Sequence, residues 1–347
     1  MFFIKALIVI MTPSIALALP VLKGKQSLDN IRFISQDGKF TYYQRRSGKL
    51  QLSTNYSNKE VLEGQKHTQY FIHSSPARNK LLIEQDNAFH REMGVNKVNK
   101  IHLVDFGGHE SKLLAEGISP RLHRDDSYIS IFYPKEKLIG VREVKDSKDK
   151  VLIELLNPLN PSFVPKVLMP TPNDVIYTDI NKEGHQAFLI HAVLDKKMKT
   201  LYKAVYPGSK LEGCIVGEDL IVGEFPQVAN MSGSRIVKIP LFNNENYLKT
   251  DIIYQAQNSD IGNMVCNDNK VFFIKTMAHN KKINLKETEV ASINLKTKEV
   301  TVLSDLEYVT QIISMDGMIL APLRGKYYII KGKRNIVNDA LKKDKSK

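Results

Sequence analysis

The chain has no tryptophan and only two cysteines, Cys214 and Cys266, in 347 residues. Two thiols are too few for a disulfide-rich scaffold or for a zinc site built from paired cysteines. The repeat assignment below puts Cys214 in the outer part of one unit and Cys266 in the inner part of another. We therefore expect two buried, unpaired thiols. A disulfide between them is the alternative, which an oxidising compartment would permit.

Long apolar runs are also missing. No stretch after the N-terminus reaches the roughly 20 apolar residues that a membrane-spanning helix needs. Residues 1–18 have the order of an export signal: Lys5, an apolar stretch from Ala6 to Met11, and a small-residue cleavage site at Ala16-Leu17-Ala18. We expect cleavage after Ala18, a periplasmic or secreted location and no transmembrane segment in the mature chain. An uncleaved signal anchor is the alternative.

The sequence lacks complete motifs of several enzyme and metal-binding classes. His123-Arg124-Asp125-Asp126 resembles a kinase catalytic loop, but no Asp-Phe-Gly follows it and no Gly-rich nucleotide loop accompanies it. Met231-Ser232-Gly233-Ser234 lacks the first glycine of a hydrolase nucleophile elbow. The nine histidines form no helical metal pair, and Asn267-Asp268-Asn269 lacks the spacing of a calcium loop. We expect no catalytic residue, no metal site and no cofactor.

Acidic residues are fewer than basic ones. The chain has 50 Lys and Arg against 37 Asp and Glu, a net charge of +13. For an exported protein we expect no nucleic acid partner, because such a protein meets envelope polymers, lipid headgroups and acidic proteins instead. A solvated basic surface with no binding role is the plainer interpretation.

What the sequence does contain is a repeat of turn residues and short apolar runs, about every 36 to 58 residues. Ser35-Gln36-Asp37-Gly38-Lys39 precedes Phe40–Tyr43, and Asn267–Lys270 precedes Val271–Ile274. Such a unit cannot bury its apolar face alone and must stack on its neighbours. This predicts an all-β protein, a β-propeller of four-stranded antiparallel blades.

The repeat also predicts the domain organisation. We count seven blades, or six if Leu220 to Ser259 does not form a full unit. The fourth unit is expected to run from about Pro170 and to end with the strand Gly213 to Val216, and the strands of the fifth are expected to begin near Gln227. Turns are expected at Ser47-Gly48 and, within a hairpin, at Lys296-Thr297-Lys298. The propeller domain is expected over residues 19–332, with a basic tail at 333–347 that is disordered or forms a short helix. The last unit has only three strands in this assignment, so we expect the N-terminal residues 21–23 to supply its fourth.

The segment Phe33 to Tyr43, with Ser35-Gln36-Asp37-Gly38-Lys39 at its centre, resembles the Ser-Pro-Asp-Gly-Lys repeat of TolB-like propellers. Ser314-Met315-Asp316-Gly317-Met318 is a second match, and Ser119-Pro120 a weaker one. These relatives of the WD40 class are periplasmic and non-enzymatic, so the resemblance implies a binding role. The Trp-Asp ending of true WD40 repeats is absent, since the chain has no tryptophan.

One long loop is the best binding candidate in the sequence. The segment from Asn87 to Lys100 is basic and has an apolar tip, and long loops in compact domains are often functional. Its candidate contact residues are Phe89, His90, Arg91, Met93, Lys97 and Lys100.

These features favour a monomeric, non-catalytic scaffold that binds an envelope protein or peptide at the central opening or at one face. Two alternatives are a propeller enzyme, a hydrolase or lyase acting on envelope polysaccharide, and a binder of anionic polymers. Clustered carboxylates with a histidine in the channel would favour the enzyme, and unpaired lysine, aromatic and small residues would favour binding.

Overall fold

A computed structural model describes residues 31–336 of the chain. The gaps in this range are residues 36–39, 55–56, 75–79, 88–97, 107–109, 124–125, 147, 156–162, 182, 194–196, 227–232, 242–249, 257–258, 280–281, 305–307, 316–317, 324–325 and 331–334. Within the described residues all regular secondary structure is β-strand, as the sequence predicts. Among these residues there is also no helix with the length and hydropathy to cross a membrane.

The strands are short and follow one another closely along the chain. In order they are β1 Ile31–Ile34, β2 Phe40–Gln44, β3 Leu50–Thr54, β4 Asn58–Leu62, β5 Thr68–Ser74, β6 Lys80–Asn87, β7 Asn99–Asp105, β8 Ser111–Leu122, β9 Tyr128–Tyr133, β10 Leu138–Glu143, β11 Val151–Glu154, β12 Val167–Thr171, β13 Asp174–Ile180, β14 Ala187–Val193, β15 Lys197–Lys203, β16 Ser209–Val216, β17 Asp219–Pro226, β18 Arg235–Pro240, β19 Asp251–Gln255, β20 Ser259–Asn267, β21 Lys270–His279, β22 Lys282–Asn294, β23 Val300–Ser304, β24 Ile313–Met315, β25 Met318–Leu323, β26 Lys326–Ile330 and β27 Asn335–Ile336.

Consecutive strands pair antiparallel into sheets. Five sheets have four strands each, β1–β4, β12–β15, β16–β19, β20–β23 and β24–β27, and one has seven, β5–β11. The seven-stranded sheet divides at β8: Ser111–Gly117 pairs with β7, and Ile118–Leu122 pairs with β9. A register irregularity between Ile118 and Arg121 marks the bend, as expected of a β-bulge. Divided there, the described strands group into seven four-stranded units.

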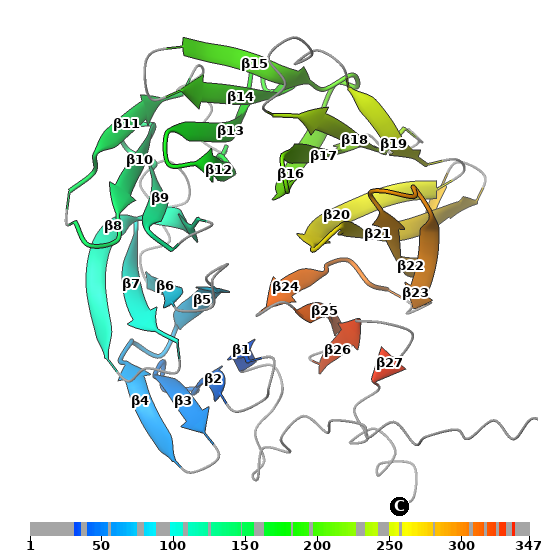
Figure 1. The fold of residues 1–347 in the computed structure, drawn as a ribbon. Helices are drawn as coiled ribbons and strands as arrows, with labels where there is room; N and C mark the ends of the chain where they lie inside the picture. The colour runs from blue at the N-terminus through cyan, green and yellow to red at the C-terminus, as the bar shows by residue number, and fades with distance from the viewer. Residues whose placement is uncertain are drawn as a thin grey trace, which may run out of the picture.

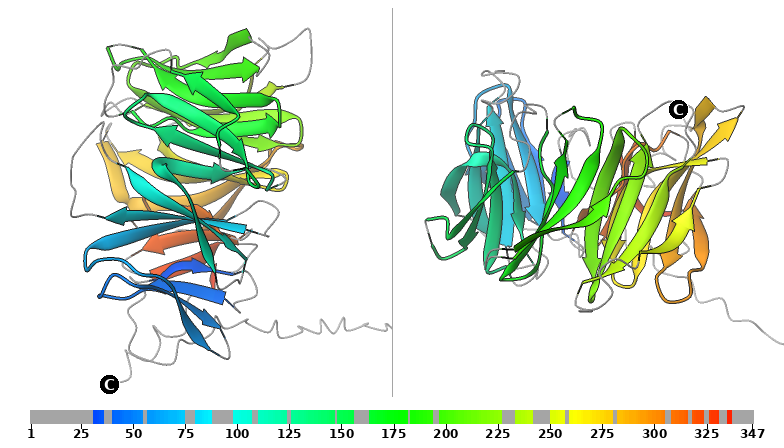
Figure 2. Two further views of the ribbon diagram at one scale, coloured as in Figure 1. Left: turned by 90° about the vertical axis from the view of Figure 1, so that its left-hand side faces the viewer. Right: turned by 90° about the horizontal axis from the view of Figure 1, so that it is seen from above.

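The sheets stand around a central opening, each with its first strand innermost (Figure 1). Seen from above in Figure 2, the strands run from one face of the ring to the other. Neighbouring innermost strands contact one another in the order β1, β5, β8, and again in the order β12, β16, β20, β24. This is the architecture of a β-propeller.

The middle strands of the sheets are buried on both faces by the neighbouring sheets. Leu81, Leu82 and Ile83 of β6, and Leu220 and Ile221 of β17, are fully buried. Strands covered on both sides carry continuous apolar runs instead of alternation, which explains these sequences. Burial of each such side chain contributes roughly 1.5–3 kcal/mol.

Apolar packing joins the first sheet to the last. Phe33 and Tyr42 of the first sheet share one buried cluster with Met318 and Leu320 of β25, and Ile313 packs against it. These side chains are more than 270 positions apart in the sequence, so the cluster joins the two ends of the described chain, whose first and last sheets share no described strand.

The turn between β2 and β3 shows why a glycine is needed. Gly48 has φ +86°, and a Cβ there would lie 1.8 Å from the carbonyl oxygen of Gln65. Tyr70 donates a hydrogen bond of 2.7 Å to the Gly48 carbonyl and ties this turn to the next sheet. Ser47-Gly48, which the sequence analysis assigns to this turn, therefore has its physical explanation.

The assignment of units four and five is off by one strand. Gly213–Val216 was predicted to end the fourth unit, but these residues belong to β16, the innermost strand of the next sheet. No strand was predicted at β17 or at β12, whose Val167–Thr171 opens the fourth sheet.

This displacement by one strand explains why the two cysteines were expected to be unpaired. Cys214 and Cys266 lie on β16 and β20, the innermost strands of adjacent sheets, with their Cα atoms 6.1 Å apart, and they form a disulfide. This separation is within the usual range for a disulfide. The default expectation of unpaired thiols is therefore wrong, because both residues are on inner strands.

The last sheet obtains its fourth strand from the C-terminal side of the chain. Ile329 and Ile330 of β26 pair with Ile336 and Asn335 of β27. Residues 21–23, the expected donor, lie outside the described residues, as do residues 1–18 and 337–347. The strand β27 lies beyond residue 332, where the sequence analysis ends the folded domain.

Candidate binding site in the central channel

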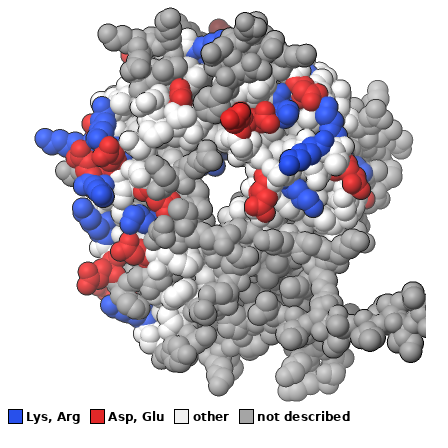
Figure 3. Space-filling model, viewed as in Figure 1, with Lys and Arg blue, Asp and Glu red and all other residues white. Residues whose placement is uncertain are grey.

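The central channel remains open when side chains are drawn (Figure 3). The visible face around it carries both acidic and basic side chains. The channel walls are the innermost strands, and no strand in the described part of the chain pairs with their inner edges. Three basic residues from three neighbouring sheets approach one another on this wall: Arg121, Lys166 and Lys210.

Arg121 is an exposed residue at the inner end of β8. Its Nη1 donates a 3.1 Å hydrogen bond to the carbonyl oxygen of Val167 on β12. The carbonyl of the preceding residue, Lys166, accepts a hydrogen bond from the Thr178 N–H of β13. Because successive carbonyls of a strand point in opposite directions, the Val167 carbonyl points to the inner edge of its sheet. The guanidinium of Arg121 is thereby placed in the channel.

The surroundings of Arg121 are unusual for a guanidinium. Among the described residues it has no carboxylate partner. Although Arg121 is exposed to the channel, the surrounding protein displaces part of the bulk water around its guanidinium and lowers its pKa. Burial lowers the pKa of Lys166 and of His123, and the charge of Arg121 adds to both effects. A charged group held this way offers its remaining N–H groups to an anion in the channel.

Glu212 of β16 is the carboxylate nearest to the two lysines. Its Oε1 accepts from Nζ of Lys166 and of Lys210, each at 2.8 Å. Burial acts to raise the pKa of Glu212, but the charges of the two lysines outweigh it and hold the pKa below its ordinary value. Burial lowers the pKa of Lys166 despite this pairing. The cluster thus holds three cations and one ionised carboxylate.

A bulge in the next sheet fixes Glu212. The β20–β21 register shifts between Gly262 and Met264, and Asn263 has φ +39°. The bulge frees the Met264 N–H, which donates to Glu212 Oε2 at 2.8 Å, while Asn263 Oδ1 accepts from the Ile312 N–H at 2.7 Å. Glu212 therefore contacts the sheets on both sides of its own.

A second polar group lies between the β5–β8 sheet and the inner segment of β8. Glu84 is buried, accepts from Asn99 at 2.7 Å and from the Ser119 N–H at 3.4 Å, and lies 3.6 Å from Nε2 of His73. Burial acts to raise the pKa of Glu84, but these hydrogen bonds hold it below its ordinary value. Glu84 is thus an ionised acceptor that other groups already satisfy.

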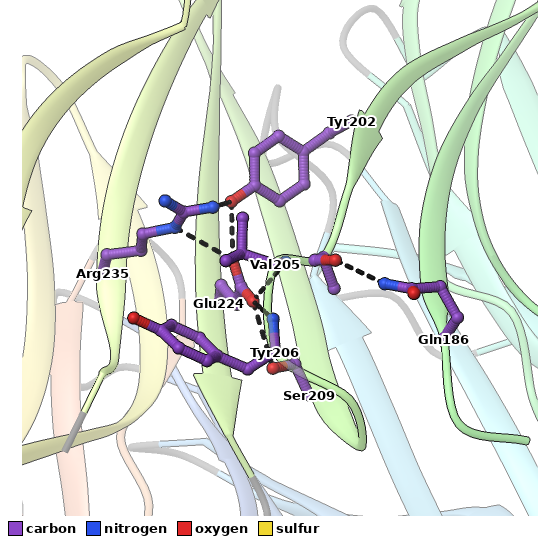
Figure 4. A network of polar contacts seen from close by, with 8 residues as sticks. Gln186, Tyr202, Val205, Tyr206, Ser209, Glu224 and Arg235 are labelled. Atoms are coloured by element: carbon purple, nitrogen blue, oxygen red, sulfur yellow. Dashed lines mark hydrogen bonds and ion pairs between the residues drawn. The ribbon is translucent and has the colours of Figure 1, made fainter. Parts of the chain in front are cut away.

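The most connected polar group joins the fourth and fifth sheets (Figure 4). Glu224 of β17 is fully buried. Its donors are the Tyr202 hydroxyl (2.6 Å), the N–H groups of Val205 (2.7 Å) and Tyr206 (2.9 Å), the Ser209 hydroxyl (3.1 Å) and Arg235 Nε (3.0 Å). The side chain of Gln186 also donates to the Ala204 carbonyl and holds the same turn. All lone-pair directions of this carboxylate are engaged, so the group is structural.

His123 has a structural role. It is buried, and its Nε2 lies 2.9 Å from the Ser130 hydroxyl. Burial, followed by the charge of Arg121, lowers its pKa to about 3. The interpretation of His123 to Asp126 as a turn agrees with a hydrogen bond from the Asp126 N–H to the His123 carbonyl.

This burial predicts an acid-sensitive fold. As the pH falls below about 6.5, the unfolded imidazole takes up a proton that the folded one does not, so the unfolded state is stabilised relative to the folded state. We expect the free energy of unfolding to fall by on the order of 1 kcal/mol per pH unit from His123 alone between pH 6 and 4. The His123→Gln variant should have a correspondingly smaller slope in urea unfolding. The exposed His185→Gln control should keep the original slope, and equal slopes for all three proteins would contradict the assignment.

Of the six candidate contact residues in the segment Asn87 to Lys100, the structure describes only one. Phe89, His90, Arg91, Met93 and Lys97 lie outside the described residues. Lys100 is exposed on β7, a strand that is not innermost, and pairs in register with Gln85 and Glu116. No cluster of three or more His, Cys, Asp or Glu side chains that suits a metal ion occurs in the described part of the chain.

Sequence reasoning missed the channel cluster. Lys210-Leu211-Glu212 and Arg121-Leu122 alternate polar with apolar residues on inner strands, and that alternation was the available signal. It could not show that three different sheets bring these residues together.

Comparison with known proteins shows the fold. No family model matches the chain, and no curated protein matches it. The structure is similar to the acylaminoacyl peptidase of Pyrococcus horikoshii (TM-score 0.57, 11% identity, 89% of this chain and 52% of that chain). It is also similar to the β-propeller domain of the Trilobed protease from Pyrococcus furiosus, described as having an open velcro topology (TM-score 0.54, 11% identity, 85% and 86%). The chain spans about half the length of the peptidase, and at this identity the likeness concerns the β-propeller fold alone.

Proposed function

We propose that this chain is an exported, seven-bladed β-propeller of the TolB-like class that binds a protein or peptide of the cell envelope and has no catalytic role. The signal-like residues 1–18 support the location, and the repeat around Ser35 supports the class. The binding surface in this proposal is the central channel.

The cluster of Arg121, Lys166 and Lys210 is the observation that carries the proposal. A rigid wall contributed by three sheets holds charged donors in place before any ligand arrives, which lowers the entropic cost of binding. One of these donors has no carboxylate partner among the described residues. Such a site is suited to recognition.

Two carboxylates near the channel, Glu212 and Glu84, favour binding over hydrolysis. A general acid at neutral pH needs a raised pKa, as in the glycosidases. Glu212 and Glu84 have lowered pKa values, because basic or hydrogen-bonding groups stabilise their charged forms. Both are suited to hold neighbouring strands and donors in position.

Affinity capture from native envelope extract tests the proposal. Three baits are compared: the wild type, a channel variant (Arg121→Gln, Lys166→Gln, Lys210→Gln) and a control in which exposed lysines of outer strands are changed (Lys59→Gln, Lys112→Gln, Lys199→Gln). The two variants lose the same charge. We expect one protein to co-purify with the wild type and the control and to be depleted about tenfold or more with the channel variant. Equal recovery with all three baits, or turnover of an envelope glycan by the purified protein, would refute the proposal.

A further inference from the structure

We propose that the occupant of the channel is an extended acidic peptide segment, whose carboxylates bind Arg121, Lys166 and Lys210. This inference rests on the proposed function and specifies the chemistry of the partner.

The charge balance of the cluster selects an anion. Lys166 and Lys210 both direct Nζ to the same oxygen of Glu212, and the other oxygen accepts from the Met264 N–H. Arg121 donates to a neutral carbonyl. Within this group of three cations and one carboxylate, two positive charges are therefore in excess. Because field lines concentrate between low-dielectric walls, this charge acts more strongly in a channel than on an open surface.

The geometry of Arg121 favours carboxylates. A guanidinium has five N–H donors in a planar fork, and the described hydrogen bond uses Nη1 only. A carboxylate can accept two parallel hydrogen bonds from such a fork. The exposed ammonium groups of Lys166 and Lys210 each have further N–H donors for a second acidic side chain.

An exposed aromatic side chain favours a peptide over a polysaccharide. Phe71 of the innermost strand β5 is 46% exposed. Side chains of a strand alternate between its faces, so Phe71 shares a face with His73, which neighbours Glu84. Glu84 accepts from Ser119 of β8, so this face of β5 is turned to the segment that carries Arg121. An exposed aromatic side chain therefore lies on the innermost strand that contacts β8, the strand of Arg121, which suits a segment with both acidic and apolar side chains.

The inner strand edges add backbone recognition. Backbone C=O and N–H groups that point away from the sheet at these edges accept or donate hydrogen bonds, as the carbonyl of Val167 and the N–H of Met264 show. An extended peptide presents both donors and acceptors to such edges.

Fluorescence anisotropy with synthetic peptides tests this inference. The probe is a labelled, capped peptide of Asp, Glu and Leu spaced by Gly and Ser, and its twin has Asn and Gln in place of the acids. We expect the purified protein to bind the acidic peptide about tenfold or more tightly than the twin, with affinity that falls as salt rises. Arg121→Gln should remove most of this preference without orphaning a carboxylate. Lys166→Gln with Glu212→Gln removes an ion pair as a unit and should weaken binding less than Arg121→Gln.

The controls separate the alternatives. Circular dichroism and the thermal midpoint report whether each variant is folded, and the outer-strand triple variant should bind within about twofold of the wild type. Equal binding of the acidic and neutral peptides would overturn the inference. Full competition by inorganic phosphate or by polygalacturonate at equal charge would also overturn it, in favour of an anion or polymer site. If the captured envelope protein still depends on the channel cluster while the acidic peptide does not bind, the inference fails and the proposed function stands.

Discussion

Replacing Glu224 by alanine is expected to lower the free energy of unfolding by about 3–5 kcal/mol. The carboxylate accepts from five donors, and the variant would leave Nε of the partly buried Arg235 and the hydroxyl of Tyr202 without their acceptor. Burial, followed by the hydrogen bond to Glu224, raises the pKa of Tyr202, so this hydroxyl stays protonated and needs an acceptor. Urea unfolding followed by circular dichroism measures the loss.

Two variants control this experiment. The Glu224→Gln variant keeps the side-chain shape and one acceptor oxygen, so it should lower the free energy of unfolding less than Glu224→Ala. Some loss is still expected, because the new NH2 group would face donors that bind a carboxylate oxygen in the wild type. Glu218→Ala changes an exposed residue in the neighbouring β16–β17 turn and should stay within about 0.5 kcal/mol of the wild type. A Glu224→Ala loss as small as that of Glu218→Ala would contradict the assigned network.

Removing the Cys214–Cys266 disulfide is expected to cost about 4 kcal/mol. The bond closes a loop of 52 residues, and the chain-entropy relation for a loop of that length gives this magnitude. The Cys214→Ala, Cys266→Ala double variant and the reduced wild type should unfold at similar, lower urea concentrations.

The double variant supplies the control, because it has no thiol and a reductant should not alter its midpoint. Thiol titration of the unfolded wild type should find no free thiol before reduction. Two free thiols, or an unchanged midpoint after reduction, would show that the cysteines are unpaired.

The strands could be predicted from the sequence where the turns beside them contain residues that stabilise a turn by local hydrogen bonds. Phe40–Gln44 matches β2, and the expected hairpin around Lys296-Thr297-Lys298 lies between β22 and β23. In that turn Asn294 Oδ1 accepts from the N–H groups of Lys296 and Thr297, and Lys298 has φ +58°. Local hydrogen bonding fixes such a turn without help from the rest of the fold.

The errors arose where a strand continues through residues that usually interrupt one. The second unit was predicted to end at Gly117, but β8 continues through Gly117 and Pro120 and serves two sheets, with a bulge at Ser119. No strand was predicted at β17, which contains Gly223 and Pro226. Packing of neighbouring sheets on both faces decides these cases, and a single sequence does not contain that information.

The candidate site depended on the same missing information. The residue types were visible, but Arg121, Lys166 and Lys210 are far apart in the sequence and meet only because successive inner strands line one channel. No role was predicted for Glu212, which pairs with Lys166 and Lys210, because the predicted fourth unit was displaced by one strand from the observed sheet.

Closure of the ring is the claim on which the channel and its ligand depend. In a sample with labelled methyl groups, nuclear Overhauser contacts between Ile31 or Leu50 and Met318 or Leu320 test it directly, since all four belong to one buried cluster. The account predicts such contacts between the first and last sheets in the isolated protein. Contacts confined to each sheet, with none between the two, would mean an open stack of sheets and would contradict it.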